Sequence, residues 1–153
     1  MTQILSRFIE CIVFKNHTFD PKFLVLKRSD DAKVHPGIWQ IVTAKIDDGE
    51  KAYETARREV KEETGLKPVE LYVAPSINHF YNFWDDSINL IPVFIAEVDS
   101  DDVKISDEHS EFEWLSFEDA FGRIHWENQR KMLEETYKHL KSKELLKTLR
   151  KIV

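Results

Sequence analysis

The amino-acid sequence predicts one α/β or α+β domain over residues 1–153, with helices covering the faces of a mixed β-sheet. Short apolar runs typical of strands alternate with only two substantial helical patterns, which favours this fold class. The chain contains no internal repeat, low-complexity tract or linker. Its 153 residues are enough to build one hydrophobic core without disulfides.

The N-terminal half is predicted to begin with a strand hairpin and to end with a helix. Ala52, Ala56 and Val60 recur at i, i+4 and i+8 in this helix, and Gly65 ends it. The hairpin consists of a buried strand over Phe8–Phe14, a turn over Asn16–Pro21 and a second strand over Phe23–Leu26. After it we expect a polar loop over Ser29–Gly37, a short extended piece over Trp39–Thr43, a tight turn over Asp47–Gly49 and the helix over Glu50–Thr64.

The C-terminal half is predicted to contain strands followed by one long amphipathic helix from Trp126 onward. Its apolar stripe indicates either docking on the domain's own sheet, which we favour, or contact with a partner helix or membrane. The stripe consists of Leu133, Tyr137, Leu140, Leu145 and Leu149. Before this helix we expect strands over Glu70–Ile77 and Asn89–Val98 and an acidic loop over Asp99–Asp107. A third strand over Phe112–Leu115 and a helical turn over Ser116–Asp119, capped by Ser116, follow the loop.

Composition narrows the function and the compartment. A net charge of −6, from 22 Lys plus Arg and 28 Asp plus Glu, argues against binding to a nucleic-acid polymer. Small polyanions stay compatible, because a bound cation can reverse the local field. The single Cys11 lies in an apolar run, so we expect a buried thiol and neither a disulfide nor a cysteine-rich zinc site. With no recognisable signal peptide or membrane-length apolar run, we expect a cytoplasmic protein that contacts no membrane; its oligomeric state stays open.

Three glutamates of the predicted helix share one of its faces. Glu59, Glu62 and Glu63 stand at i, i+3 and i+4, within an arc of about 100°. Like charges this close repel one another, and the helix dipole disfavours negative charge late in a helix. A face of this kind is either a solvated surface or a site for a hard divalent cation, which prefers oxygen ligands.

The segment around these glutamates resembles the Nudix box. That motif reads Gly, five residues, Glu, seven residues, then Arg-Glu-aliphatic-any-Glu-Glu-any-Gly-aliphatic. In this chain Glu50 stands eight positions before Arg58, and the rest follows without a gap from Arg58 to Leu66. One position departs, because Ala44 replaces the first glycine. A methyl group there restricts φ, which puts the geometry of the loop in question but removes no ligand.

The resemblance implies a fold, an activity and a set of roles. The Nudix fold is an α/β/α sandwich around a mixed sheet, here with a long C-terminal helix. The family hydrolyses nucleoside diphosphates linked to another group, using Mg²⁺ or Mn²⁺. The implied roles are metal ligation, a further ligand or general base, positioning of the glutamates, support of the loop, and a carbonyl ligand. Glu59 and Glu63 would be the metal ligands, and Glu62 the further ligand or general base. Arg58 would position the glutamates, Glu50 would support the loop, and Thr43 would supply the carbonyl ligand.

Shorter segments are similar to the branch of the family that hydrolyses dATP and dihydroneopterin triphosphate. They are Leu26–Asp31, Gly37–Thr43, Glu108–Leu115 and Trp126–Arg130. The similarity implies Glu108 as a further metal carboxylate. It also implies Arg28, Thr43, Asn128 and, less directly, Arg7 as residues that contact substrate.

The expected activity is Mg²⁺-dependent pyrophosphohydrolysis of a nucleotide or pterin triphosphate, such as dATP or dihydroneopterin triphosphate, to the monophosphate and pyrophosphate. The alternatives are hydrolysis of a dinucleoside polyphosphate or ADP-ribose, and a non-catalytic nucleotide-binding regulator on the same fold. An aromatic patch around His79–Trp84 matches no motif. It reads either as a surface that stacks on a flat ring or as satellite core packing.

Overall fold

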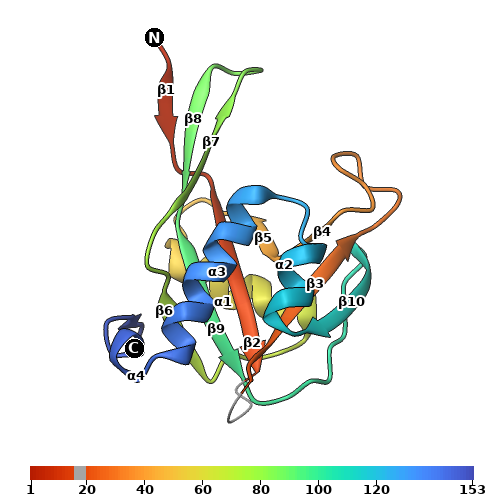
Figure 1. Cartoon of the computed structure of the whole chain (residues 1–153). Helices are drawn as coiled ribbons and strands as arrows, with labels where there is room; N and C mark the ends of the chain where they lie inside the picture. The colour runs from red at the N-terminus through yellow and green to blue at the C-terminus, as the bar shows by residue number, and fades with distance from the viewer. Residues whose placement is uncertain (16–19) are drawn as a thin grey trace.

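The structure, a computed structural model that describes residues 1–15 and 20–153, is a sheet sandwiched between helices (Figure 1). Its central eight-stranded sheet has the order β10-β3-β2-β9-β6-β11, with β4 added to β3 and β5 to β2. Strands β2 and β9 run parallel and the other pairs are antiparallel, so the sheet is mixed as predicted. The elements are β1 Gln3–Leu5, β2 Phe8–Lys15, β3 Lys22–Arg28, β4 Trp39–Gln40, β5 Val42–Lys45, α1 Ala52–Thr64, β6 Glu70–Val73, β7 Asn78–Asn82, β8 Ser87–Ile91, β9 Val93–Val98, β10 His109–Leu115, α2 Phe117–Arg123, α3 Glu127–Lys141, α4 Lys143–Leu146 and β11 Arg150–Lys151.

Strand β2 runs through the middle of the sheet and contributes to a core on each face. Ile9, Cys11 and Val13 pack into the core under α1. Ile12 and Phe14 pack into the other core, which α2 and α3 cover. Side chains alternate between the faces of a strand, so a strand buried on both faces reads as a continuous apolar run. The α/β/α sandwich is therefore confirmed, and Cys11 is buried as expected.

Helix α1 ends where the sequence predicts but begins later. The backbone N–H of Gly65 donates to the carbonyl of Lys61 at 2.8 Å, with Gly65 in the left-handed region at φ 73°. The N-cap is Lys51, and its backbone N–H donates to the carboxylate of Glu54 at 2.9 Å. The predicted start at Glu50 was wrong by two residues, because that side chain turns back toward Arg58.

The prediction of one continuous helix from Trp126 onward was wrong. Helix α3 ends at Lys141, because Ser142 has an extended backbone (φ −119°, ψ 118°) and caps α4 through its hydroxyl. The chain then forms β11, which pairs with β6. Leu133, Leu149 and partly buried Tyr137 still pack into the core beneath α3, so docking on the domain's own sheet is confirmed.

Other element boundaries also differ from prediction. The strand expected over Asn89–Val98 is divided at Pro92 between β8 and β9, because proline has no N–H for the ladder. The strand expected over Glu70–Ile77 stops at Val73, and β10 starts at His109 rather than Phe112. Ser116 caps α2 as predicted, accepting from the N–H of Asp119. Most of the turn expected over Asn16–Pro21 lies outside the described residues.

A second, three-stranded sheet was missed entirely. It has the order β1-β8-β7 and extends beyond the body of the domain (Figure 1). Strand β7 lies in the segment whose aromatic pattern matched no motif, and the three residues of β1 pair only with β8 in the part of the chain that the structure describes. We call β1, β7, β8 and the turn over residues 83–86 the arm.

Candidate active site

Arg58 lies at the centre of a group of carboxylates on α1 and the loop before it. Its Nε and Nη2 donate to the two oxygens of Glu50 at 2.8 and 2.9 Å, a two-pronged contact. Its Nη1 donates to Glu59 Oε1 at 2.6 Å and to Glu62 Oε2 at 3.1 Å. Planar, two-pronged contacts of arginine with carboxylates fix orientation as well as charge. Arg58 therefore holds Glu50, Glu59 and Glu62 in fixed relative positions.

Glu50 is the most strongly held of these acids. The hydroxyl of Thr55 donates to its Oε2 at 2.6 Å, beside the two contacts from Arg58. Hydrogen bonds from Arg58, and then from Thr55, lower the pKa of Glu50 to about 2. Permanent ionisation and saturated oxygens suit an acid that ties the loop over residues 46–50 to the helix, rather than one that takes up a proton.

Glu63 lies one helical turn after Glu59 on α1 and is buried; we call its surroundings, with Glu59, Glu108 and His109, the acid pocket. It is only 2% exposed, and as a carboxylate it has no hydrogen-bond donor among the described residues. Burial, and then the nearby acids Glu108 and Glu59, raise the pKa of Glu63 to about 10. A proton on Glu63 would supply the hydrogen bond to Glu108 that two carboxylates cannot form.

The acids around this pocket come from two separate parts of the chain. Glu108 is exposed and precedes β10, whereas Glu59 and Glu63 come from α1. Burial raises the pKa of Glu59 despite its contact with Arg58, and Glu62 and Glu108 add to the rise. One ligand atom each from Glu63, Glu108 and His109 lies within 4.8 Å of the others.

The residues present fit a divalent cation. Both oxygens of Glu63 are buried without a donor among the described residues, and buried polar atoms of this kind normally have a partner. Hard divalent cations prefer carboxylate oxygens, and a cation here would offset the mutual repulsion of Glu59, Glu63 and Glu108. The donors lie beside the exposed acid Glu108, so a substrate can approach from solvent.

A buried polar network around Glu10 was not anticipated. Glu10 is 4% exposed, and its two oxygens accept from Asn78 Nδ2 at 2.8 Å and from Gln129 Nε2 at 2.6 Å. Gln129 Oε1 in turn accepts from the N–H of Ile41 at 3.2 Å. Burial raises the pKa of Glu10, which the two amide hydrogen bonds oppose. A lone acid inside the apolar run Phe8–Phe14 is the sequence signal for this network.

Thr43 belongs to the edge of the same network. Its hydroxyl donates to the carbonyl of Ile41 at 3.1 Å and accepts from Gln129 Nε2 at 3.3 Å. The next residue, Ala44, pairs with Ile9 in the ladder between β5 and β2, and its methyl group packs against the core. Ala44 lies in a regular strand and is not among the described residues with positive φ, so no glycine is required there by the backbone.

The other residues expected to contact substrate have partners within the protein. Arg28 donates through Nε to the carbonyl of Val34 at 3.0 Å, and its charge lowers the pKa of Glu63 slightly. Asn128 donates to the carbonyl of His79 at 3.2 Å, which ties the start of α3 to β7. Arg28 is thus close enough to the acid pocket to act on Glu63, whereas Asn128 lies against the base of the arm.

Arg7 lies at the root of the arm. Its Nε donates to Asn89 at 3.0 Å, and its two terminal nitrogens donate to Asp85 at 2.9 Å and Ser87 at 3.2 Å. These contacts occupy both edges of the guanidinium. The geometry therefore assigns Arg7 to holding β8 against β2, and its expected contact with substrate stays a prediction without support from these contacts.

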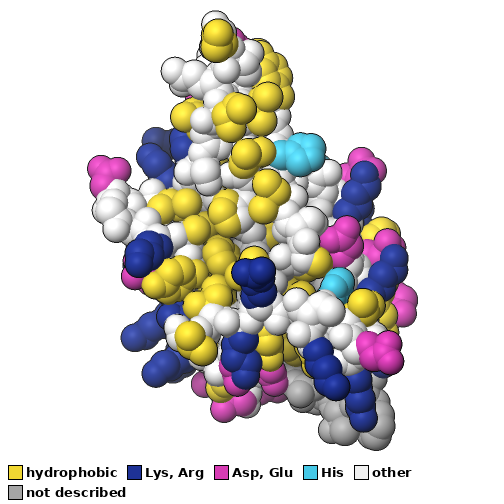
Figure 2. All heavy atoms as spheres, turned by 90° about the vertical axis from the view of Figure 1, so that its left-hand side faces the viewer, with side chains coloured by type: hydrophobic (Ala, Val, Ile, Leu, Met, Phe, Trp, Pro, Cys, Tyr) yellow, Lys and Arg dark blue, Asp and Glu magenta, His cyan; other side chains and the backbone are white. Residues whose placement is uncertain are grey.

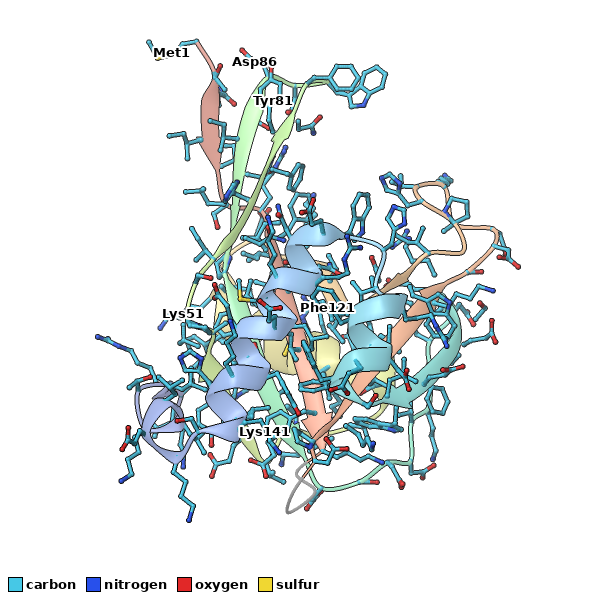
Figure 3. All side chains as sticks on the ribbon, in the orientation of Figure 1. Met1, Lys51, Tyr81, Asp86, Phe121 and Lys141 are labelled. Carbon is cyan, nitrogen blue, oxygen red and sulfur yellow. The ribbon has the colours of Figure 1, made fainter. Side chains whose placement is uncertain are left out.

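The aromatic patch is not core packing. Phe83 and Trp84 pack on each other in the arm's turn, 4.3 Å apart, and are 66% and 84% exposed. Tyr81 is also exposed, and its hydroxyl donates to Asp86 at 2.9 Å at the far end of the arm (Figure 3). Among the described residues, Phe80 is the one aromatic of this patch with a ring neighbour in the body, Phe8 at 6.3 Å.

Known proteins resemble this chain over most of its length. The asymmetrical bis(5'-nucleosyl)-tetraphosphatase of Rattus norvegicus is 31% identical over 139 residues, which cover 84% of this chain and 91% of that protein. The nucleoside triphosphatase NudI of Escherichia coli is 29% identical over 127 residues, covering 74% and 84%. Among solved structures, the dihydroneopterin triphosphate pyrophosphohydrolase of E. coli superposes with a TM-score of 0.69 at 23% identity, over 88% of this chain and 97% of that one.

The NUDIX domain family matches residues 9–136, a range that contains the whole box, Glu108 and most of α3. The helix that carries Glu59, Glu62 and Glu63 and the sandwich around it agree with this match. In residues 1–15 and 20–153 no helix is both long and apolar enough to cross a membrane. The chain belongs to the Nudix family and is a Nudix hydrolase.

Proposed function

We propose that this protein is a Mg²⁺-dependent pyrophosphohydrolase that cleaves a nucleoside triphosphate or a pterin triphosphate to the monophosphate and pyrophosphate. The observation that carries the proposal is the buried, donor-free carboxylate of Glu63 beside Glu59 and Glu108. Carboxylate oxygens in this arrangement are the ligands that a hard divalent cation prefers. A family with hydrolases of nucleotide polyphosphates is consistent with this chemistry.

The proposed roles of the acids follow from their surroundings. Glu59, Glu63 and Glu108 would hold Mg²⁺, or Mn²⁺ in its place, with the Thr43 carbonyl as a further ligand. When bound, the cation neutralises the diphosphate and lowers the pKa of a coordinated water. Glu62, whose side chain is 58% exposed and reaches Arg58 at 3.1 Å, is free to act as a general base or a further ligand.

Arg58 and Glu50 act as positioning residues in this scheme. Their two-pronged contact joins the loop over residues 46–50 to α1, and the remaining nitrogen of Arg58 orients Glu59 and Glu62. Neither residue needs to touch substrate. A change in Arg58 is therefore expected to lower kcat and to weaken cation binding together.

A second substrate class, dinucleoside tetraphosphates, is favoured by the 31% identity to the rat tetraphosphatase. Both substrates present the same kind of phosphoric anhydride bond to the cation site, and they differ in the group beyond it. We propose that Arg28, Thr43 and Asn128 contact that group. We propose the triphosphate as substrate and the dinucleoside tetraphosphate as the competing class.

The decisive experiment measures kcat/KM at one Mg²⁺ concentration for dATP, dGTP, dihydroneopterin triphosphate, diadenosine tetraphosphate and ADP-ribose, with products separated by ion exchange. A triphosphate should give pyrophosphate. If a dinucleoside tetraphosphate or ADP-ribose is preferred by tenfold, about 1.4 kcal/mol in transition-state binding, the triphosphate assignment is wrong.

Glu63→Gln and Glu134→Gln provide a matched pair for the same assay. Glu63 is buried in the acid pocket, whereas Glu134 lies on the exposed face of α3 beside Lys138. We expect the first variant to lose activity by orders of magnitude and the second to retain it. If the wild type turns over no substrate of the panel with Mg²⁺ or Mn²⁺, the proposed activity is wrong. We further propose that it acts in the cytoplasm, where Cys11 stays reduced.

A further inference from the structure

His109 is a buried histidine whose ring has no hydrogen-bond partner among the described residues. It begins β10, directly after Glu108, and is 4% exposed. Neither Nδ1 nor Nε2 meets a donor or acceptor within the described chain. Leaving buried polar atoms without partners costs free energy, so such an arrangement needs an explanation.

The unpartnered nitrogens lie beside the unpartnered oxygens of Glu63. One ligand atom each from His109, Glu63 and Glu108 lies within 4.8 Å of the other two. A direct hydrogen bond from the ring to Glu63 would satisfy both groups, yet none is formed among the described residues. A cation between them would satisfy both at once, because imidazole nitrogen and carboxylate oxygen are both metal ligands.

We propose that His109 is a nitrogen ligand of the divalent cation, alongside Glu63 and Glu108. The proposal rests on the proposed function, since it concerns the same cation site. It changes the chemistry of that site, because an imidazole suits Zn²⁺ and Fe²⁺ better than Mg²⁺, which prefers oxygen ligands. The protein should therefore bind Zn²⁺ more tightly than Mg²⁺ by a wider margin than a site made of oxygen ligands alone.

The test is pulsed electron paramagnetic resonance of the Mn²⁺-loaded protein, which detects nitrogen bound directly to the ion. Protein prepared with ¹⁵N-labelled histidine should replace the ¹⁴N modulation by the ¹⁵N pattern. His109→Gln should abolish the histidine modulation and weaken Mn²⁺ binding by about tenfold or more. His35→Gln serves as the control, since that ring lies in the loop before β4 and packs on Trp126.

Each outcome decides the matter. Histidine modulation in the wild type and in His35→Gln, absent in His109→Gln, supports the proposal. Mn²⁺ binding without histidine modulation in the wild type overturns it while leaving the hydrolase function intact. Absence of both Mn²⁺ binding and metal-dependent hydrolysis overturns the proposed function as well. Where His109→Gln fails to fold, the isotope exchange in the wild type still shows whether any histidine binds the ion, and its absence overturns the proposal.

The arm supports a second, independent inference. One row across its sheet consists of Ile4, Ile88 and Tyr81, which the strand registers place side by side. They are 69%, 37% and 58% exposed, and Phe83 and Trp84 continue the apolar surface at the end. Figure 2, which looks onto the β1 side of the molecule, shows hydrophobic side chains gathered on this projecting part.

The two acids of the arm's turn have partners within the protein. One oxygen of Asp86 accepts from the hydroxyls of Thr2 at 3.0 Å and Tyr81 at 2.9 Å, and Asp85 pairs with Arg7 at 2.9 Å. Strand β1 carries no charge, and its outer edge pairs with no strand in the described part of the chain. Natural edge strands are usually protected by charge, proline or bulges, so an edge of this kind is suited to pairing.

The exposed area is close to what one side of a stable dimer needs. At about 200 Å² for each fully exposed large side chain, the five apolar residues expose on the order of 600 Å². A standard interface buries about 800 Å² on each partner, and a monomer's largest apolar patch is about 300–600 Å². We infer that two copies of this chain associate through their arms about a two-fold axis, with β1 pairing antiparallel to β1 of the other copy.

Sedimentation equilibrium between 1 and 100 μM tests this inference. The wild type should approach twice the monomer mass of 18.1 kDa. Ile88→Lys, and separately Phe83→Ser with Trp84→Ser, should sediment as monomers, while Leu145→Lys, which changes a 41% exposed leucine on α4, should dimerise. Circular dichroism checks folding. A monomeric wild type at 100 μM, or equal dissociation by Leu145→Lys, overturns the inference, and the arm would then face another molecule.

Discussion

Glutamine at position 63 removes an ionisable group from the interior while keeping its size and shape. Glu63 is 2% exposed and has a pKa of about 10 against an ordinary value of 4.5, with burial as the largest cause and Glu108 and Glu59 as the next. In the metal-free protein at neutral pH, Glu63 therefore carries a proton. Glutamine resembles this protonated state, so Glu63→Gln should fold normally without metal.

The pH dependence of stability follows from the same pKa. Below pH 4.5 the folded and unfolded chains both hold this proton, and Glu63 does not affect the free energy of unfolding. Between pH 4.5 and about 10 the unfolded chain releases the proton and the folded chain retains it. The free energy of unfolding then falls by up to about 1.4 kcal/mol per pH unit. A domain has only about 5–15 kcal/mol in total, so the loss is large.

Urea unfolding at pH 6, 7, 8 and 9 in the presence of a chelator measures this slope in the wild type and in Glu63→Gln. The other titrating groups are shared, so the difference between the two slopes reports Glu63 alone. The variant should be the more stable protein at pH 9 without metal. Equal slopes in the two proteins would show that Glu63 is ionised in the metal-free fold, and the reasoning from burial would fail.

Bound metal should make the wild type more stable than Glu63→Gln, the reverse of the order expected without metal. Cation binding displaces the proton of Glu63, so the wild type should release close to one proton from this group at pH 7 and bind more tightly as pH rises. Mg²⁺ should raise the unfolding midpoint of the wild type and have little effect on Glu63→Gln. Calorimetry in buffers of different ionisation enthalpy counts the protons.

Three further changes test other parts of the site. Arg58→Lys loses the two-pronged contact with Glu50, and kcat should fall by about 10²-fold in steady-state assays; an unchanged kcat would show that the acids orient themselves. Ala44→Gly should leave activity equal or higher and lower the free energy of unfolding by about 0.5–1 kcal/mol, because glycine weakens a strand; a large loss of activity in folded protein would contradict this. Gln129→Leu leaves one oxygen of buried Glu10 without its donor, so urea unfolding should show a loss of about 1–3 kcal/mol, and a neutral result would mean that water replaces the amide.

The glutamate face could be predicted because it depends on helical geometry alone. Glu59, Glu62 and Glu63 are neighbours in sequence, and Arg58 reaches Glu62 one turn away on the same helix. The three acids differ in burial: the Glu62 side chain is largely exposed beside Arg58, whereas Glu63 is buried near the start of β10. The spacing of the three acids contains no information on which of them the rest of the chain covers.

The network around Gln129 and the three strands of the arm could not be predicted in the same way. Gln129 contacts Glu10 across 119 residues, and Asn78 contacts it across 68. Strand β1 is three residues long, too short for a reliable periodic pattern, and it forms only because β8 lies beside it. Ser142 interrupts the apolar stripe of the C-terminal segment by changing backbone direction, while Leu149 still packs beneath α3.

The sequence by itself determined what depends on local spacing: the buried strands, the helix with its glycine stop, the two-faced core around β2 and the family to which the box belongs. Tertiary structure alone decided which atoms meet across the chain. It brought Glu108 and His109 close to Glu63. It engaged Arg7 and Asn128 in hydrogen bonds to the arm, and it gave Glu10 its amide partner Gln129. The physical reason is that periodicity fixes the direction of a side chain on its own element, whereas its burial and partners depend on the elements that pack against it.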